Sequence, residues 1–316
     1  MNRNTTKTRR LKIRHQTTYT YDTPVQRSTH TLHLKPIHDW KQSVLSHALT
    51  ITPANDQATV TSRNAIIEFE DVFGNTGVRF EIDHPYTSLT IDAESHIELL
   101  DVDPFAFTKL PKRPVLPVAW MPWEQKMLGP YLQPMELPDT QLSELFEYAS
   151  DFVRANNNDL METLFAINLE FKKSYQYVPG STCNETTPFQ VYATKKGVCQ
   201  DFAGLFIQMA RLLGLPARYV CGYIYTGNIN DAMADASHAW LQVYIPNVGW
   251  KGFDPTNGTL PCTDHVRLAY GRYYGDTTPT AGTLFSPANE TISVSVRVED
   301  EQAAVAETSN LALVEK

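Results

Sequence analysis

The sequence is poor in cysteine, has no excess of basic residues and contains no long apolar run. Its four cysteines among 316 residues leave gaps of 16, 22 and 41 positions, which fit neither a CxxC metal clip nor a disulfide framework: Cys183, Cys199, Cys221 and Cys262. Lys and Arg number 27 against 35 Asp and Glu, and this net charge of -8 argues against a general nucleic-acid binder. No apolar stretch reaches the roughly 18 residues of a membrane-spanning helix, so no membrane partner is expected.

Signals for a cofactor and for export are also missing. Neither the GxxxxGK[S/T] loop nor the GxGxxG loop occurs, so no nucleotide cofactor is expected. His30 and His33 would lie on opposite faces of a strand, so no metal site is expected from them. The Arg9–Arg10 pair is not followed by the apolar segment of a twin-arginine signal, and the protein is expected to be cytoplasmic.

The first third of the chain has the pattern of β-structure. Short segments rich in β-branched and aromatic residues alternate with turn signals over 11–21, 27–35, 65–69, 78–82 and 88–99. The run D-V-F-G-N-T-G at 71–77 predicts a hairpin turn, because Gly and Asn tolerate a positive φ. No helical period of useful length is present. These features predict an N-terminal β-sandwich over residues 11–102.

A proline-rich segment follows the β-patterned region. Residues 104–138 hold eight of the twenty prolines, a density that predicts neither a regular helix nor a central strand. We therefore expect a connector over residues 103–138. Trp120 and Trp123 are expected to be largely buried against one or both domains, because a loose linker seldom carries two indoles in so short a span.

From residue 139 onward the pattern becomes a mixture of helix and strand. Apolar residues recur at helical spacing over 140–153, 160–171 and 202–213. Strand-like segments follow at 175–178, 217–225, 238–245, 250–254 and 291–298. The expected fold class is α+β, with the N-terminal sandwich followed by a catalytic domain over residues 139–298. Residues 299–316 are acidic and are expected to form a flexible tail.

The stretch G-V-C-Q-D-F-A places Cys199 where a loop enters a helix. Backbone N–H groups and the helix dipole stabilise a thiolate at such a position, and the same N–H groups can form part of an oxyanion hole. The side chain that would complete the hole is left open among four candidates: Tyr177, Gln190, Gln200 and Trp240. The alternative interpretation is a small buried core cysteine, which is what we expect of Cys183, Cys221 and Cys262.

Two further stretches supply partners for this thiol. In S-H-A-W-L-Q-V-Y-I, strand alternation puts His238 at the head of a polar and aromatic face, which suits a general base, although a structural histidine is the alternative. Asp254 ends the next strand and, taken alone, is equally a turn former. A hairpin that pairs Tyr244 with Trp250 has an even register, meaning that the numbers of any two paired residues sum to an even value. It puts Asp254 diagonal to His238 on one face, where the carboxylate can orient the imidazole, whereas an odd register separates them.

These three stretches, in this order and at these spacings, resemble the transglutaminase-like superfamily. The motifs are G-V-C-Q-D-F-A, S-H-A-W-L-Q-V-Y and G-W-K-G-F-D-P-T-N-G. The segment around D-V-F-G-N-T resembles the N-terminal β domain of many bacterial members, and D-H-V-R-L-A-Y-G-R and E-T-I-S-V-S-V are similar to their C-terminal portion. The resemblance covers about residues 11–298. It implies a papain-like α+β core with Cys199, His238 and Asp254 as a catalytic triad.

The triad and the resemblance predict a thiol enzyme that acts on peptide or amide bonds of a peptide or protein substrate. Cys199 would form an acyl-enzyme with help from His238, and water or an amine would resolve it. Hydrolysis by a peptidase or amidase is favoured because water is always present. Aminolysis by a transamidase or ligase is the alternative, and a non-catalytic interaction module is a hypothesis of another class.

The loop that precedes His238 is expected to border an open cleft. Residues 227–236 are small and polar, which favours a mobile loop beside the site. Asp231 and Asp235 within it would favour basic or neutral substrates over acidic ones. The alternative is that both carboxylates are only solvated.

Overall fold

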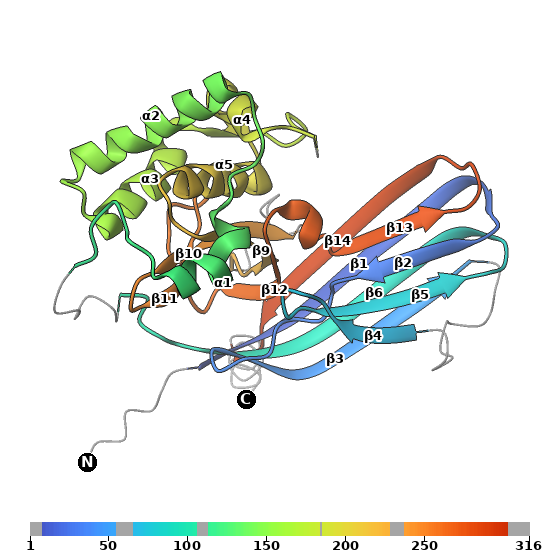
Figure 1. Cartoon of the computed structure of the whole chain (residues 1–316). Helices are drawn as coiled ribbons and strands as arrows, with labels where there is room; N and C mark the ends of the chain where they lie inside the picture. The colour runs from blue at the N-terminus through green and yellow to red at the C-terminus, as the bar shows by residue number, and fades with distance from the viewer. Residues whose placement is uncertain (1–7, 55–65, 106–112, 184, 228–236, 303–316) are drawn as a thin grey trace, which may run out of the picture.

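The computed structural model describes residues 8–54, 66–105, 113–183, 185–227 and 237–302. It combines a β-sandwich with an α+β domain whose helices gather on one side (Figure 1). The α+β fold class with an N-terminal β-sandwich is confirmed. Among the described residues, no helix has both the length and the apolar character needed to cross a membrane.

The sandwich is built from two four-stranded sheets. Its strands are β1 (Thr8–Val25), β2 (Ser28–Leu32), β3 (Gln42–Pro53), β4 (Ile66–Glu70), β5 (Thr76–Ile82), β6 (Tyr86–Leu100), β13 (Thr280–Leu284) and β14 (Glu290–Asp300). One sheet has the order β14-β1-β6-β3 and the other β13-β2-β5-β4. Alternate side chains of β1 and β6 are buried, as expected for strands with one face on a core, and these include Leu11, Ile13, Leu89 and Ile91.

The expected strands of the first third are present, with one addition. The segments predicted from alternation correspond to β1, β2, β4, β5 and β6, and the predicted hairpin turn joins β4 to β5 with Gly74 at φ 81°. Strand β3 was not predicted. Most of its side chains are exposed or half-buried, so it lacks the apolar alternation that reveals a strand.

The last two strands belong to the sandwich, which corrects the predicted domain boundaries. β14 pairs with β1 from Leu11↔Asp300 to Tyr21↔Glu290, and β13 pairs with β2. The α+β domain is therefore inserted between β6 and β13 and does not extend to residue 298, and the first two residues of the expected tail lie in β14. Alternation over 291–298 reveals a strand but not its partner, which lies at the other end of the chain. Residues 303–316 of the expected tail lie outside the described residues.

The inserted domain contains helices α1 (Pro122–Leu132), α2 (Asp139–Ala155), α3 (Leu160–Ser174), α4 (Pro188–Thr194) and α5 (Cys199–Leu212). Its main sheet has the order β11-β10-β9-β12, formed by β9 (Ala217–Ile224), β10 (His238–Ile245), β11 (Gly249–Phe253) and β12 (His265–Gly271). The short strands β7 (Gln176–Tyr177) and β8 (Lys196–Gly197) pair in parallel, and a 3-10 turn, η2 (Tyr274–Asp276), follows β12. Helix α4 lies outside the segments for which a helix was predicted, although Thr187 and Gln190 form a capping box at its start.

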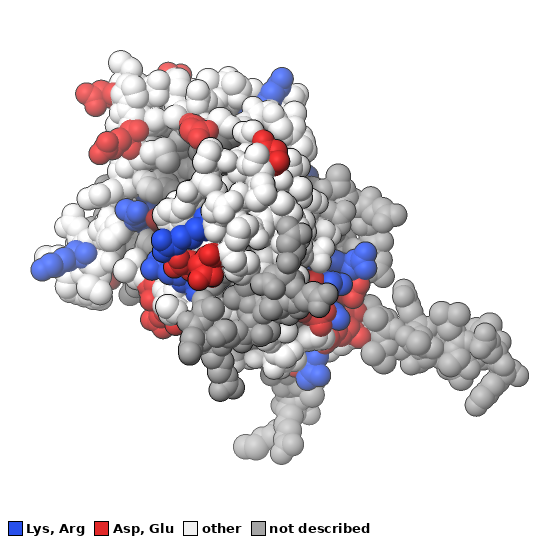
Figure 2. Space-filling model, turned by 90° about the vertical axis from the view of Figure 1, so that its right-hand side faces the viewer, with Lys and Arg blue, Asp and Glu red and all other residues white. Residues whose placement is uncertain are grey.

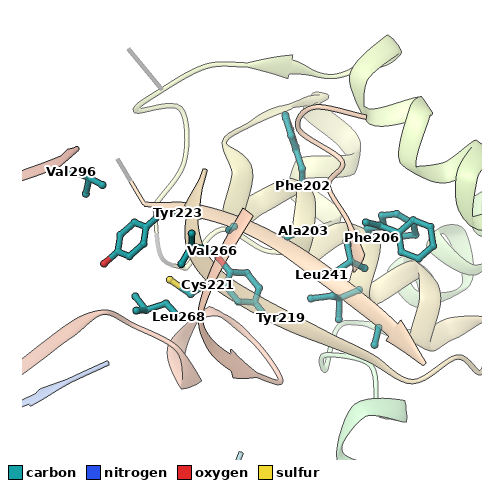
Figure 3. Packing of buried hydrophobic residues seen from close by; sticks show 14 of the residues in the cluster. Phe202, Ala203, Phe206, Tyr219, Cys221, Tyr223, Leu241, Val266, Leu268 and Val296 are labelled. Carbon is teal, nitrogen blue, oxygen red and sulfur yellow. The ribbon is translucent and has the colours of Figure 1, made fainter. Parts of the chain in front are cut away.

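The main sheet lies between helix α5 and the sandwich. Figure 3 shows helix residues facing sheet residues in one apolar cluster that continues toward the sandwich: Phe202, Ala203, Phe206, Tyr219, Cys221, Tyr223, Leu241, Val266, Leu268 and Val296. On the opposite face of the sheet, Val220, Trp240 and Tyr270 pack against Ile37. Both faces of the sheet are therefore covered by other elements. This packing holds the ends of its strands in place relative to α5.

Strand β12 is anchored to the sandwich by buried hydrogen bonds. The register with β9 shifts between Arg267 and Ala269, as at a β-bulge. The Gln42 side chain pairs with the backbone at this point, donating to the Arg267 carbonyl and accepting from the Arg267 N–H, each at 2.8 Å. The Arg267 guanidinium binds both carboxylate oxygens of Asp39 at 2.6 and 2.8 Å. The sandwich therefore helps to position the strand that begins at His265.

The proline-rich connector differs from its prediction in two respects. It contains helix α1, because Pro122 occupies the first turn, where no N–H is needed, and the Glu124 carboxylate accepts from the Met121 N–H at 3.0 Å. Trp120 does dock, since its Nε1 donates to the Gly214 carbonyl at 2.8 Å. Trp123, in contrast, is 65% exposed, so the expectation that both indoles are buried is wrong for this one. Helix α1 buries no residue, so the Trp123 ring has no apolar core to pack against.

Candidate active site

Cys199 is the first residue of α5, as the sequence predicted, and its side chain is partly exposed. The loop before it is held by Asp201, whose carboxylate accepts from the Val198 N–H and from the Thr182 hydroxyl, each at 2.7 Å. A Cβ at Gly197 would approach the Asp201 side chain to 2.8 Å, so this close turn requires glycine. The chain therefore places a thiol at a rigid helix start, next to N–H groups that have no intrahelical acceptor.

His238 and Asp254 meet through the even one of the two hairpin registers that the sequence left open. Tyr244 pairs with Trp250 in the β10–β11 hairpin, and His238 Nε2 lies 2.9 Å from Asp254 Oδ2. The Cys199 side chain also lies near enough to the His238 ring to raise the pKa of that ring. Because Nε2 faces the carboxylate, Nδ1 is the nitrogen left for the thiol. The structure thus brings together the three predicted residues from α5, from β10 and from the end of β11.

Hydrogen bonds outweigh burial in setting the protonation states of His238 and Asp254. Burial alone lowers the pKa of His238, but the hydrogen bonds to Asp254 and Cys199 raise that pKa to about 10. Burial alone raises the pKa of Asp254, but the hydrogen bonds from His238 and His265 hold it well below its usual range. The arrangement at neutral pH is therefore an imidazolium held by a carboxylate. Such a cation lies beside Cys199, the residue expected to act as the nucleophile.

A second histidine on the same carboxylate was not predicted. His265 Nε2 lies 3.0 Å from Asp254 Oδ2, and Asn257 donates to this oxygen from its side chain at 2.7 Å and to Oδ1 from its backbone at 3.2 Å. Of the nine histidines, only His238 and His265 follow residue 96, which was the available signal. The signal was insufficient because the contact depends on the placement of β12 by the sandwich.

His238, Asp254 and His265 are also a combination of side chains that could hold a metal ion. Their ligand atoms lie within 4.8 Å of one another, and all three residues are buried. Two imidazoles and a carboxylate suit zinc and other first-row metals. A metal here would occupy His238 Nε2 and displace the proton shared with Asp254. It would therefore compete with the thiol chemistry described above.

A cleft of about 390 Å³ runs along the first turns of α5. Gln200, Asp201, Gly204 and Ile207 line it from the helix, and Tyr219, Tyr273 and Tyr274 line it from the sheet side. Among the oxyanion-hole candidates, Gln200 adjoins the thiol in this cleft. Gln190 is engaged in the α4 capping box, and Trp240 faces the opposite side of the sheet. The predicted loop over 228–236 lies outside the described residues.

We expect Cys199 to be the fastest-reacting thiol of the four. It lies near the His238 ring, whereas burial raises the pKa of Cys221 to about 12. Cys183 and Cys262 are exposed, so the expectation of buried core cysteines is wrong for these two and holds only for Cys221. In the described structure their side chains contact Thr186 and Asp264, not an imidazole. Limited iodoacetamide labelling at neutral pH, followed by peptide mapping, measures the order. Preferential labelling of any other cysteine would contradict the assignment, and a His238→Ala variant should remove the difference.

The face shown in Figure 2 carries basic and acidic side chains interspersed, and neither sign forms a continuous patch there. Surface charges of mixed sign are typical of a soluble surface that does not steer a polyanion. The exposed charges on this face therefore give no lead to function. The features that indicate a function are the side chains of Cys199, His238 and Asp254 and the cleft along α5.

Comparison with known proteins agrees with these motifs. The model of the transglutaminase-like superfamily matches residues 147–255, and that of the bacterial transglutaminase-like N-terminal region matches residues 11–98. An uncharacterised protein of Mycobacterium tuberculosis is 31% identical over 313 residues, covering 92% of this chain and 93% of that protein. A protein-glutamine gamma-glutamyltransferase of Pseudomonas aeruginosa is 33% identical over 95 residues, covering 28% of this chain and 14% of that protein.

The fold is also found in a solved structure. A Cytophaga hutchinsonii protein, provisionally named a cysteine protease, superimposes with a TM-score of 0.70 at 24% identity, covering 93% of this chain and 91% of that one. The likeness extends over the sandwich and the inserted domain together. From the matched core, the matched N-terminal region and the full-length relative, the chain belongs to the transglutaminase-like superfamily, with a bacterial transglutaminase-like N-terminal region.

Proposed function

We propose that this protein is a thiol enzyme that cleaves peptide or amide bonds through an acyl-thioester on Cys199. The observation that carries the proposal is the pairing of His238 Nε2 with Asp254 Oδ2 at 2.9 Å, on an imidazole whose pKa the nearby Cys199 raises. A nucleophile, a proton carrier and an orienting acid are the three parts that acyl transfer requires. The cleft lined by Gln200, the chain neighbour of Cys199, is the place that we assign to the substrate.

The chemistry follows from the protonation states. Cys199 Sγ, as the thiolate, attacks the carbonyl carbon, and the N–H groups at the start of α5 stabilise the oxyanion. The C–N bond then breaks, and the leaving amine takes the proton from His238. Water attacks the thioester while His238 accepts a proton, and the acid product leaves as the thiolate is restored. Asp254 stays ionised throughout and holds the ring in position.

We favour hydrolysis as the fate of the thioester because water reaches an open cleft without a second binding site. Aminolysis is the second candidate. It is favoured by the partial match to a protein that bears the name protein-glutamine gamma-glutamyltransferase. The same three side chains serve both reactions, because the outcome depends on which nucleophile reaches the thioester.

Intact-mass spectrometry with a peptide library, with and without an added primary amine, tests the proposal. Hydrolysis of a peptide bond gives fragments that together gain the elements of water, and hydrolysis of a side-chain amide gives a deamidated peptide that takes up water and loses ammonia. Aminolysis gives peptide–amine conjugates only when the amine is present. A trapped adduct that maps to Cys199 identifies the acyl-enzyme, and Cys199→Ala is the blank. Unchanged peptides in every arm would overturn the proposal and favour the non-catalytic interaction module.

Gly204 gives a test of the cleft that leaves the reacting groups intact. It lines the cleft from α5, and an added Cβ meets no heavy atom within 4 Å. Gly204→Ala should raise the free energy of unfolding by up to about 1 kcal/mol through helix propensity. Gly204→Leu should obstruct the cleft and reduce peptide turnover at least about tenfold, a change of ~1.4 kcal/mol in barrier, while iodoacetamide labelling of Cys199 stays near the wild-type rate.

Gly129 provides the matched control for this experiment. It lies in α1, where an added Cβ also meets no heavy atom within 4 Å, and it does not line the cleft. Gly129→Leu should leave turnover unchanged. Equal turnover in the Gly204→Leu variant and the wild type would show that substrate does not occupy this cleft.

A further inference from the structure

A second cavity, of about 90 Å³, lies behind the candidate active site, between the sandwich and the outer face of the main sheet. The end of β6 and Lys41 line it from the sandwich, and residues of β10, β11 and β12 line it from the sheet. Six of the lining side chains are charged or carry a buried polar nitrogen: Lys41, Asp103, Trp240, Lys251, His265 and Arg267. This cavity and the cleft along α5 share no lining residue, so they are separate. It has room for several water molecules or a small ion.

Two side chains that line this cavity have buried nitrogen atoms without a hydrogen-bond partner among the described residues. They are Trp240 Nε1 and His265 Nδ1, on rings whose centroids are 5.1 Å apart. Trp240 is 0% exposed and His265 is 5% exposed. An indole N–H can only donate, and leaving it unpaired in the interior is unfavourable. The Trp240 N–H therefore needs a hydrogen-bond acceptor, and the described residues do not supply one.

The charges of the side chains that line the cavity also favour a bound anion. Lys41, Lys251 and Arg267 contribute three cations, and Asp103, which attracts the Lys251 ammonium, contributes one carboxylate. The Lys251 ammonium also lies 3.5 Å from the Pro104 carbonyl oxygen. Arg267 is already paired with Asp39. Burial lowers the pKa of Lys41, and the charges of Lys251 and Arg267 lower it further, which means that these cations repel one another across the cavity. A bound anion relieves that repulsion.

We propose that this cavity binds a small oxyanion of the phosphate or carboxylate class. Its oxygens accept from the Trp240 indole N–H and from the ammonium groups of Lys41 and Lys251. His265 Nε2 must donate to the Asp254 carboxylate, so Nδ1 of the neutral ring is an acceptor and is not one of the donors to the anion. The site therefore lies one side chain away from the triad carboxylate. It does not depend on the proposed enzymatic function, because it binds without turnover.

Isothermal titration calorimetry of the full chain with inorganic phosphate, and separately with acetate, tests the site at constant ionic strength. We expect saturable binding of one ion per chain in the millimolar range or tighter. The Trp240 indole N–H resonance, identified by its loss in Trp240→Phe, should shift with the same saturation curve. Binding of phosphate alone assigns a phosphate-class ligand, and binding of both anions assigns a general oxyanion site.

Lys41→Met should weaken binding at least about tenfold, and Lys251→Met should do the same. Lys41 is only half-buried, so its replacement should not prevent folding, which circular dichroism checks. Lys173→Met, at an exposed position in the last turn of α3, is the matched control and should bind like the wild type. No saturable binding of either anion to the wild type, or equal binding by the wild type and Lys41→Met, would overturn the proposal.

Discussion

Replacement of Cys199 or His238 by alanine should reduce turnover to the uncatalysed level, whereas Asp254→Asn should retain a rate about 10²–10⁴-fold below that of the wild type. The thiol and the imidazole take part in bond making and proton transfer, so neither has a substitute. Asp254 acts through His238, whose Nε2 it holds at 2.9 Å. Its loss therefore misplaces the ring without removing the nucleophile.

The measurement is the rate of substrate conversion by each variant on the best peptide from the library experiment, together with the rate of alkylation of Cys199. Asp254→Asn should slow both, because the imidazolium that stabilises the thiolate is no longer held. Asp83→Asn is the matched control, since the Asp83 side chain is 86% exposed and contacts the adjacent His84. Full activity in Asp254→Asn would remove this carboxylate from the mechanism.

The site could be predicted from the sequence because its three parts lie in local patterns. The helix start at Cys199 follows from the loop before an apolar stripe, and the meeting of His238 with Asp254 follows from a hairpin whose register is set by its short turn. Each inference spans fewer than about twenty residues. Within such a span, strand alternation and turn length restrict the geometry to two registers, of which one brings the acid to the base.

The parts that could not be predicted depend on contacts between distant segments. Thr17 pairs with Val294 in the sandwich, and nothing in either segment specifies the other. His265 reaches Asp254 only because Gln42 and Asp39 of the sandwich hold β12 at its bulge. Predicting this contact needed the order of strands in space, which alternation and spacing do not encode.

Asp254→Asn should also destabilise the fold by about 3–5 kcal/mol near pH 6, because it breaks a buried ion pair and leaves the partner imidazole without its counter-charge. Asp254 is 0% exposed and accepts from His238, His265 and Asn257, so no water can replace the lost acceptor. Urea unfolding of wild type and variant, read from the midpoints at an unchanged slope, measures the difference.

The pH dependence of that difference identifies the charged pair as its source. The lowered pKa of Asp254 contributes stability that is present above the ordinary carboxyl value of about 4 and is lost as the pH falls through the folded value. The raised pKa of His238 contributes stability that is complete below the ordinary value of about 6.5 and is lost as the pH rises toward about 10.

The gap between wild type and Asp254→Asn should therefore be widest between about pH 4 and pH 6.5 and should narrow steadily toward about pH 10. Asp83→Asn should show no such trend, because that carboxylate is exposed. A gap that stays constant across the alkaline range would mean that His238 is neutral in the folded protein at neutral pH. The thiol would then lack an imidazolium partner, and Cys199 would have to be activated by general-base transfer at the moment of attack rather than by a standing ion pair.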